Sequence, residues 1–220
     1  MIKFENITKI YKASGVETTA LDGVDVTIED GKLVAIIGPS GSGKSTMLNI
    51  IGGMDSVTEG TYECDDIVVS DLKGRALHKF RKNKISFIFQ NFALMNQYSV
   101  YENVELPLIA KKYKRSERKK IVYKNLELMG IKDLAKKYPT QISGGQQQRC
   151  AIARALASGN DIILADEPTG ALDQKTGEEI MKVLCDLNKL GKTVIIVTHD
   201  RNVANKCEMV LEIVDGKLKN

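Results

Sequence analysis

Residues 33–45 read Leu-Val-Ala-Ile-Ile-Gly-Pro-Ser-Gly-Ser-Gly-Lys-Ser, and this stretch decides the fold. Its first five residues form a continuous apolar run, which is typical of a strand buried on both faces in a parallel sheet. The next eight match Gly-x4-Gly-Lys-Ser, a glycine-rich loop that turns backbone N–H groups onto phosphate oxygens where a helix begins. Residues 45–51 have the pattern of that helix, and Gly52-Gly53 ends it. The stretch therefore predicts an α/β protein that binds nucleotide phosphates.

The loop also assigns roles to individual residues. The Lys44 ammonium is expected to reach the β- and γ-phosphates, and the Ser45 hydroxyl is expected to bind Mg²⁺. The dipole of the following helix adds a favourable field for an anion. The residues predicted to contact ATP here are Gly38, Pro39, Ser40, Gly41, Ser42, Gly43, Lys44, Ser45 and Thr46.

Apolar runs elsewhere alternate with helical patterns. Strands buried on both faces are expected at 85–89, 161–165 and 193–197, with a helix over 174–190. Shorter strands are expected at 2–7, 21–28 and 60–70, with polar residues 12–19 as a connection and a closing hairpin at 209–218. Residues 92–157 are mainly helical in pattern, punctuated by Pro107 and Pro139. This alternation indicates an α/β core into which a helical segment is inserted.

Composition sets the broad class of protein. The chain has 220 residues, of which 43% are hydrophobic and 27% charged, so one domain with a real core is expected. No apolar run approaches the ~18–20 residues that span a bilayer, and the N-terminus lacks a signal-peptide pattern. The four cysteines, Cys64, Cys150, Cys185 and Cys207, are widely spaced, which disfavours a metal site and suits reduced thiols. We therefore expect a cytosolic chain that relies on another polypeptide for any membrane span.

The basic charge is concentrated in one segment. The net charge of +4 is weak support for a nucleic-acid partner, and none is expected. Residues 111–124 hold eight lysines and arginines, namely Lys111, Lys112, Lys114, Arg115, Arg118, Lys119, Lys120 and Lys124. Such a run is usually a solvated helix face; the alternative is a surface kept near an anionic membrane leaflet.

A second motif narrows the nucleotide chemistry. Residues 142–146 read Ile-Ser-Gly-Gly-Gln, and about twenty residues later an apolar run, 162–167, ends in Asp-Glu. Taken alone, Ser143 is a helix N-cap and Asp166-Glu167 is a surface turn. Combined with the phosphate loop, the arrangement resembles that of the nucleotide-binding subunits of ABC transporters. Ile142 replaces the more usual leucine of that family, a volume-conserving change of small cost.

The resemblance covers the whole chain and implies a fold. It implies a P-loop ABC ATPase core of the RecA-like type, with a mostly parallel sheet, an antiparallel β subdomain and an inserted helical subdomain. Residues 1–220 would be a single nucleotide-binding domain. Within it, 1–90 and 158–220 would form the ATP-binding core with its β subdomain, and 91–157 the helical subdomain that carries the signature.

The resemblance also implies catalytic roles. Glu167 would be the general base, His199 would contact the γ-phosphate and orient the water, and Lys44 would stabilise charge. Asp166 and Gln90, with Ser45, would hold Mg²⁺. Tyr11 would stack on adenine, whereas a lone tyrosine or histidine is otherwise more often a packing residue.

Further residues are implied to act across a dimer. Ser143, Gly145 and Gln146 of one subunit would contact ATP held by the other, and Asp173 of the D-loop would cross the same interface. The expected assembly is an ATP-dependent, head-to-tail homodimer, with a paralogue as the alternative second half. ATP would favour the closed state, and hydrolysis would separate the subunits.

Residues 91–107 and 164–173 resemble one subgroup: MacB-type exporters, LolD-type lipoprotein-releasing subunits and bacitracin-resistance systems. The resemblance implies an ATPase at the cytoplasmic face of a bacterial membrane, driving a permease in export or mechanotransmission of an antimicrobial peptide, lipoprotein or macrolide-like cargo. A hydrophobic patch of Phe92, Leu94, Met95 and Tyr98 would dock the permease. The alternative is a soluble ABC-type ATPase acting on nucleic acid or the ribosome, but the chain has neither inserted coiled coils nor tandem cassettes. The sequence does not name the cargo, the permease or the direction of transport.

Overall fold

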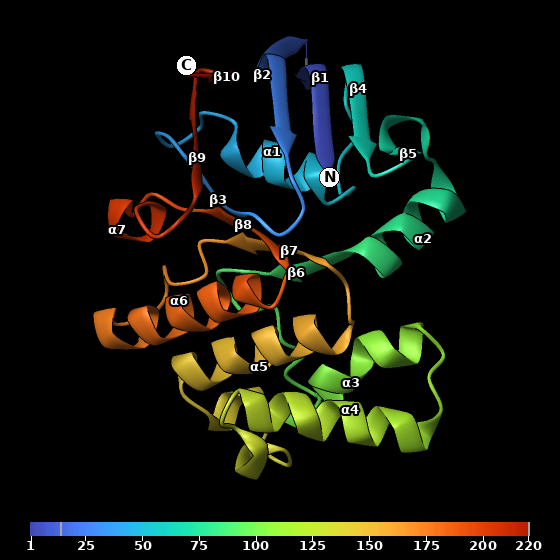
Figure 1. The fold of residues 1–220 in the computed structure, drawn as a ribbon, viewed down its shortest axis with the longest axis vertical. Coiled ribbons are helices and arrows are strands. Elements are labelled where there is room, and N and C mark those ends of the chain that lie inside the picture. Colours follow the sequence, from blue (N-terminus) through green and yellow to red (C-terminus); the bar gives the residue numbers. More distant parts are fainter. Residues whose placement is uncertain (14, 220) are drawn as a thin grey trace. The chain divides into compact units, whose positions relative to one another are not determined.

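The computed structural model describes residues 1–13 and 15–219, which divide into two compact units (Figure 1). The first unit comprises Met1–Arg81 and Cys185–Asn220, and the second comprises Lys82–Leu184. None of the helices that the structure describes is long and apolar enough to cross a membrane.

An antiparallel sheet of order β2-β1-β4-β5 lies in the first unit. Its strands are β1 (Ile2–Ala13), β2 (Val16–Ile28), β4 (Glu59–Cys64) and β5 (Ile67–Val68). One face of the sheet is apolar and buried, with Phe4 edge-on to Tyr62 at 5.0 Å between ring centroids. The Tyr62 hydroxyl donates a hydrogen bond of 2.7 Å to the Ile51 carbonyl at the end of α1. The short η1 (Val69–Asp71) and helix α2 (Gly74–Lys84) follow the sheet in sequence.

The same unit contains the strands that carry the phosphate loop. Strand β3 (Leu33–Ile37) pairs in parallel with β8 (Thr193–Val197) and with β9 (Met209–Val214), and β10 (Lys217–Leu218) closes the hairpin onto β9. Every residue of β8 is buried, as are four of the five in β3. Helix α1 (Lys44–Ile51) buries Met47, Leu48, Ile50 and Ile51, and the short α7 (Arg201–Ala204) follows β8.

The second unit pairs two parallel strands with a group of helices. Strand β6 (Ile85–Ile88) lies beside β7 (Ile162–Asp166). Helices α3 (Val100–Ala110), α4 (Arg115–Leu128) and α5 (Gly144–Ala157) pack on one another, as Figure 1 shows. The turns η2 (Lys132–Leu134) and η3 (Pro139–Gln141) connect α4 to α5, and α6 (Gln174–Lys189) follows β7. Capping boxes begin α3 at Ser99 and α5 at Ser143, which fixes where both helices start.

Most predicted elements are present within one or two residues, and the differences have physical causes. The polar segment 12–19 is not a simple connection: β1 runs to Ala13 and β2 starts at Val16. Cross-strand pairing, including an ion pair of 2.7 Å between Lys12 and Glu17, extends the hairpin although both faces there are solvated. Pro107 does not interrupt the helical pattern but lies inside α3, so the helix loses one hydrogen bond and continues.

Candidate functional site

The phosphate loop adopts a backbone that only glycine fits at two positions. Gly38 and Gly43 have φ of 147° and 109°. A Cβ on Gly38 would stand 2.0 Å from the Ile213 carbonyl oxygen, and one on Gly43 would stand 2.3 Å from that of Ala20. The loop is therefore held against β9 and β2 by close backbone contact, which makes its shape rigid.

The N-terminus of α1 is built to receive an anion. Its N-cap, Gly43, has no side chain to bond the first-turn N–H groups, and no acidic residue lies in that turn. The first-turn N–H groups therefore remain available as hydrogen-bond donors, and together with the helix dipole they favour binding of a phosphate group. The Lys44 ammonium donates to the carbonyls of Gly38 at 2.9 Å and Pro39 at 2.6 Å, so the cation lies on the loop itself. The buried Ser42 hydroxyl has no hydrogen-bond partner in the structure, which leaves a further polar group inside the loop.

Tyr11 is held beside α1 by a small polar cluster. Its hydroxyl donates 2.6 Å to Asp55, and Lys9 bonds the other Asp55 oxygen at 2.6 Å while lying 4.8 Å from the Tyr11 ring centroid. The Tyr11 hydroxyl also interacts with the Thr46 side chain, which places this hydroxyl beside the first turn of α1. Burial opposes ionisation of Asp55, but hydrogen bonds from Lys9 and Tyr11 outweigh it and lower the pKa of the carboxyl group. Tyr11 as a whole is 41% exposed, so its side chain is accessible to a planar base.

His199 lies at the carboxyl end of β8. Parallel strands β3 and β8 end at the same edge, and the phosphate loop leaves from the end of β3. Buried Thr198, the preceding residue, donates its N–H to the Ile36 carbonyl of β3 at 3.1 Å. The exposed His199 side chain therefore starts from the ligand-binding edge of this sheet.

In the second unit, Gln90 and Glu167 come together around Gly170. A Cβ on Gly170 would stand 3.0 Å from Gln90 Nε2 and 3.4 Å from the Glu167 Cβ. Asp166 ends β7, and Glu167 follows with a left-handed φ of 45°. The Gly170 N–H donates 3.0 Å to the Glu167 carbonyl and holds this strained turn. The carboxylate oxygens of Asp166 and the amide oxygen of Gln90 are ligand types that suit Mg²⁺. In the first unit, the hydroxyl of Ser45 is another oxygen ligand of this kind.

The signature motif forms the start of α5. Ser143 Oγ accepts from the Gln146 N–H at 3.3 Å, and Gln146 Oε1 accepts from the Ser143 N–H at 2.9 Å. A Cβ on Gly145 would stand 2.6 Å from Cγ2 of Thr176, so α5 approaches α6 closely there. Asp173 caps α6, with Oδ1 accepting from the Thr176 N–H and Oδ2 from its hydroxyl; these bonds lower the pKa of Asp173. The Asp173 carboxylate thus has a structural role within its own chain.

The family model described as ABC transporter matches residues 21–170, well over half of the chain. The chain belongs to the ABC transporter family. It is 51% identical to the ABC transporter ATP-binding protein MJ0796 of Methanocaldococcus jannaschii, and 46% identical to YvrO of Bacillus subtilis, each match covering at least 99% of this chain and 95% of the relative. The dimeric structure of MJ0796 bound to ADP and Pi matches it with a TM-score of 0.92 at 49% identity, covering 100% of this chain and 97% of that one.

The macrolide export protein MacB of Escherichia coli is a longer relative. It is 44% identical over 99% of this chain, which spans only 34% of MacB. These findings confirm the predicted family, the α/β fold and the ATPase activity, with ATP and Mg²⁺ as cofactors. They also support the two expected classes of partner, a second cassette and a membrane permease. They do not favour the soluble alternative that acts on nucleic acid or the ribosome.

Several contacts of this ABC cassette are not predicted by any sequence motif. Arg154 of α5 donates to the carbonyls of Phe92 and Ala93, two residues with left-handed φ that follow Gln90. Gln148, also on α5, donates to the Pro168 carbonyl. Both side chains bind backbone carbonyls of segments distant in sequence, a kind of contact for which a single sequence carries no signal.

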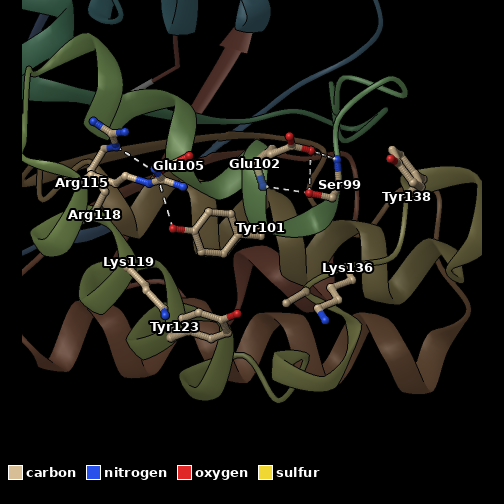
Figure 2. Close-up of a pocket in the computed structure, with 11 residues that line it drawn as sticks. Ser99, Tyr101, Glu102, Glu105, Arg115, Arg118, Lys119, Tyr123, Lys136 and Tyr138 are labelled. Atoms are coloured by element: carbon tan, nitrogen blue, oxygen red, sulfur yellow. Dashed lines mark hydrogen bonds and ion pairs between the residues drawn. The ribbon is translucent and has the colours of Figure 1, made fainter.

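A polar groove of about 770 Å³ lies on the helical part of the second unit (Figure 2). Figure 2 shows Arg118 and Tyr101 directed at Glu105, with the Ser99–Glu102 capping box to their right. The distance from Arg118 Nε to Glu105 Oε1 is 2.8 Å. None of the predicted site residues lines this groove. The basic segment 111–124 contributes Arg115, Arg118 and Lys119 to its wall, whereas Lys111 instead bonds the Ser158 carbonyl and the Asn160 side chain.

Proposed function

We propose that the chain is the ATP-hydrolysing subunit of a membrane transporter, working as an ATP-dependent, head-to-tail homodimer that drives a permease. One observation carries the proposal: two helix N-termini are suited to phosphate, that of α1 after the glycine-rich loop and that of α5, whose first two residues are Gly144 and Gly145. The first has no side-chain cap, and the second presents its N-cap, Ser143, together with Gly145. A cassette needs both, one for its own ATP and one for the ATP of the other subunit.

The phosphate loop and Tyr11 bind ATP in this proposal. Residues 38–46 surround the phosphates, Lys44 moves from its loop carbonyls to the β- and γ-phosphate oxygens, and Tyr11 stacks on the adenine. Ser45, Asp166 and Gln90 hold Mg²⁺, which neutralises phosphate charge when bound. The closeness of Tyr11 to Thr46 and the uncapped α1 support these assignments.

Glu167 takes the proton from the attacking water, and His199 orients that water against the γ-phosphate. Support comes from the turn that fixes Glu167: its left-handed backbone, the Gly170 N–H on its carbonyl, and Gln90 packed against the same glycine. A base held this firmly meets the geometric demand of hydrolysis, in which positioning and charge stabilisation do most of the work.

Ser143, Gly145 and Gln146 of each subunit contact the γ-phosphate held by the other, and Asp173 lies at the same interface. Residues 91–157 act as the helical signature subdomain, and 1–90 with 158–220 as the ATP-binding core. The assembly works at the cytoplasmic face of a bacterial membrane in export or mechanotransmission, with an antimicrobial peptide, lipoprotein or macrolide-like molecule as cargo. The permease docks on the patch of Phe92, Leu94, Met95 and Tyr98, of which Met95 and Tyr98 are exposed.

Glu167→Gln tests the catalytic assignment. The variant is expected to lose at least ~100-fold in steady-state hydrolysis, because general-base catalysis contributes about 10²–10⁴-fold, and to form a stable dimer with ATP by size-exclusion chromatography. The matched control is Glu178→Gln, which changes an exposed glutamate of α6 and should leave turnover unchanged. Persistent hydrolysis in Glu167→Gln would overturn the general-base role, and a monomer at saturating ATP would overturn the dimer.

A pull-down of tagged protein from detergent-solubilised membranes, with the co-purifying chain identified by mass, tests the partner. A permease with few membrane spans and a large extracytoplasmic domain is expected. Recovery of ribosomal or other soluble partners alone would contradict the transport role.

A further inference from the structure

Gln148 is a buried polar residue at an unusual place on α5. It lies five residues after Ser143, its side chain is fully buried, and its Nε2 donates a hydrogen bond of 2.7 Å to the Pro168 carbonyl. Its Oε1 is buried and has no hydrogen-bond partner in the structure. Pro168 directly follows Glu167, so a side chain of the signature helix holds the peptide unit next to the proposed general base.

Stability alone does not account for this glutamine. A buried amide oxygen without a partner destabilises a fold, and this loss offsets what the hydrogen bond to the buried Pro168 carbonyl contributes. Buried unsatisfied polar groups are uncommon in native proteins, and each needs a reason. At this position the reason is the hydrogen bond from the amide nitrogen of Gln148 to the Pro168 carbonyl, which holds the segment next to Glu167.

The turn at Glu167 is held from two sides. The Glu167 carbonyl accepts from the Gly170 N–H at 3.0 Å, and the next carbonyl, that of Pro168, accepts from Gln148. Glu167 has a left-handed φ of 45°, a conformation that persists only where its surroundings hold it. A movement of α5 therefore acts directly on the backbone that aims the Glu167 carboxylate.

We propose that Gln148 is a positioning residue that couples the two ATP sites of the dimer. This inference rests on the proposed function, in which Ser143 and Gly145 contact the ATP of the other subunit and Glu167 serves the ATP of its own. The first turns of a helix are rigid, and five residues span about 7.5 Å, so a shift of α5 at Ser143 is transmitted to Gln148. Binding of ATP at one site thereby aligns the general base of the other.

Gln148→Met tests the coupling, because methionine keeps the length and burial but donates no hydrogen bond. Its matched control is Gln147→Met, which changes the adjacent glutamine of α5, whose Nε2 bonds only the Ile142 carbonyl at 3.3 Å. We expect Gln148→Met to lower kcat about 10–100-fold, the effect of a small misplacement of a catalytic group, with KM changed less than about 3-fold. The Hill coefficient for ATP should lie near two in the wild-type dimer, whose two ATP sites are coupled, and should fall toward about one in Gln148→Met. Its melting temperature should change little, because removal of the unpartnered amide oxygen offsets the loss of the hydrogen bond to the buried Pro168 carbonyl.

The outcomes separate this inference from the function on which it rests. Retained kcat and Hill coefficient in Gln148→Met, with Glu167→Gln inactive and dimeric, would overturn the coupling and leave the function standing. Loss of kcat with an unchanged Hill coefficient would also overturn it. Activity in Glu167→Gln would overturn the proposed function itself. If Gln148→Met does not fold, Gln148→Leu takes its place in the same assays, and failure of both to fold would show that the glutamine is needed for folding and overturn the inference.

Discussion

Asn103→Ala is expected to destabilise the protein strongly, because one buried side chain organises the segment after β6. Asn103 of α3 is fully buried. Its Oδ1 accepts from the Met95 N–H at 2.8 Å, and its Nδ2 donates to the carbonyls of Met95, Tyr98 and Ser99 at 3.0–3.1 Å. These four contacts fix the loop that carries Met95 and Tyr98, two residues of the proposed docking patch.

The expected magnitude follows from the hydrogen bonds. The amide has two hydrogens for three carbonyls, so about three bonds are made at once, and each contributes on the order of 1 kcal/mol. Alanine recovers about 0.5–0.7 kcal/mol through its higher helix propensity. We therefore expect a loss of about 2–3 kcal/mol in the free energy of unfolding, measured from the urea midpoint at unchanged slope.

Asn125→Ala is the matched control. Asn125 lies on α4, is 9% exposed and donates only to the Ile121 carbonyl of its own helix, at 2.9 Å. Because the helix gains propensity and loses one bond, a change below about 1 kcal/mol is expected. Equal losses in the two variants, or a loss below about 1 kcal/mol in Asn103→Ala, would refute the reasoning.

Three further changes have defined outcomes. Met95→Glu should abolish permease-coupled transport while the isolated ATPase keeps its rate, with Met54→Glu as an exposed control; a parallel fall of both activities contradicts the docking patch. Because the pKa of Asp55 is lowered in the folded protein, its carboxylate stabilises the fold at any pH above the ordinary carboxyl pKa. This contribution is lost as the pH falls through the lowered pKa. The difference in urea midpoint between the wild type and Asp55→Asn should therefore be constant above about pH 5 and shrink below it. Burial raises the pKa of Cys150 to about 12, so maleimide at neutral pH should label it only after unfolding, as read by peptide mass; labelling as fast as that of Cys185 would refute this.

Local patterns were enough for the elements that carry the phosphate loop. The apolar run 33–37, the run 193–197 and the helix after Lys44 are found almost residue for residue, because burial on both faces leaves an unambiguous sequence pattern. The sequence pattern underestimates the length of the β1–β2 hairpin for the opposite reason. Its outer part is solvated on both faces, so alternation is absent and only cross-strand pairing reveals it.

The candidate site likewise contains residues that sequence motifs predict and contacts that they do not. The positions of Ser143 and Glu167 follow from motifs, but the contacts of Gln148 and Asn103 reach backbone groups through tertiary packing. Asp173 is an intermediate case. An aspartate immediately before a helical pattern is a recognisable N-cap, and its bonds to Thr176 could have been predicted from that spacing alone.

The pairing of β3 has a consequence for how the protein is made. Both described partners of this strand in the first unit, β8 and β9, come from residues 193–214, so the apolar segment 33–37 leaves the ribosome about 155 residues ahead of its first neighbour. At ordinary elongation rates the wait is roughly 8–30 s, during which a β-branched segment has no sheet to join. We therefore expect early chaperone contact with the nascent chain and aggregation of C-terminally truncated products, because the nucleotide loop follows a strand whose neighbours are made last.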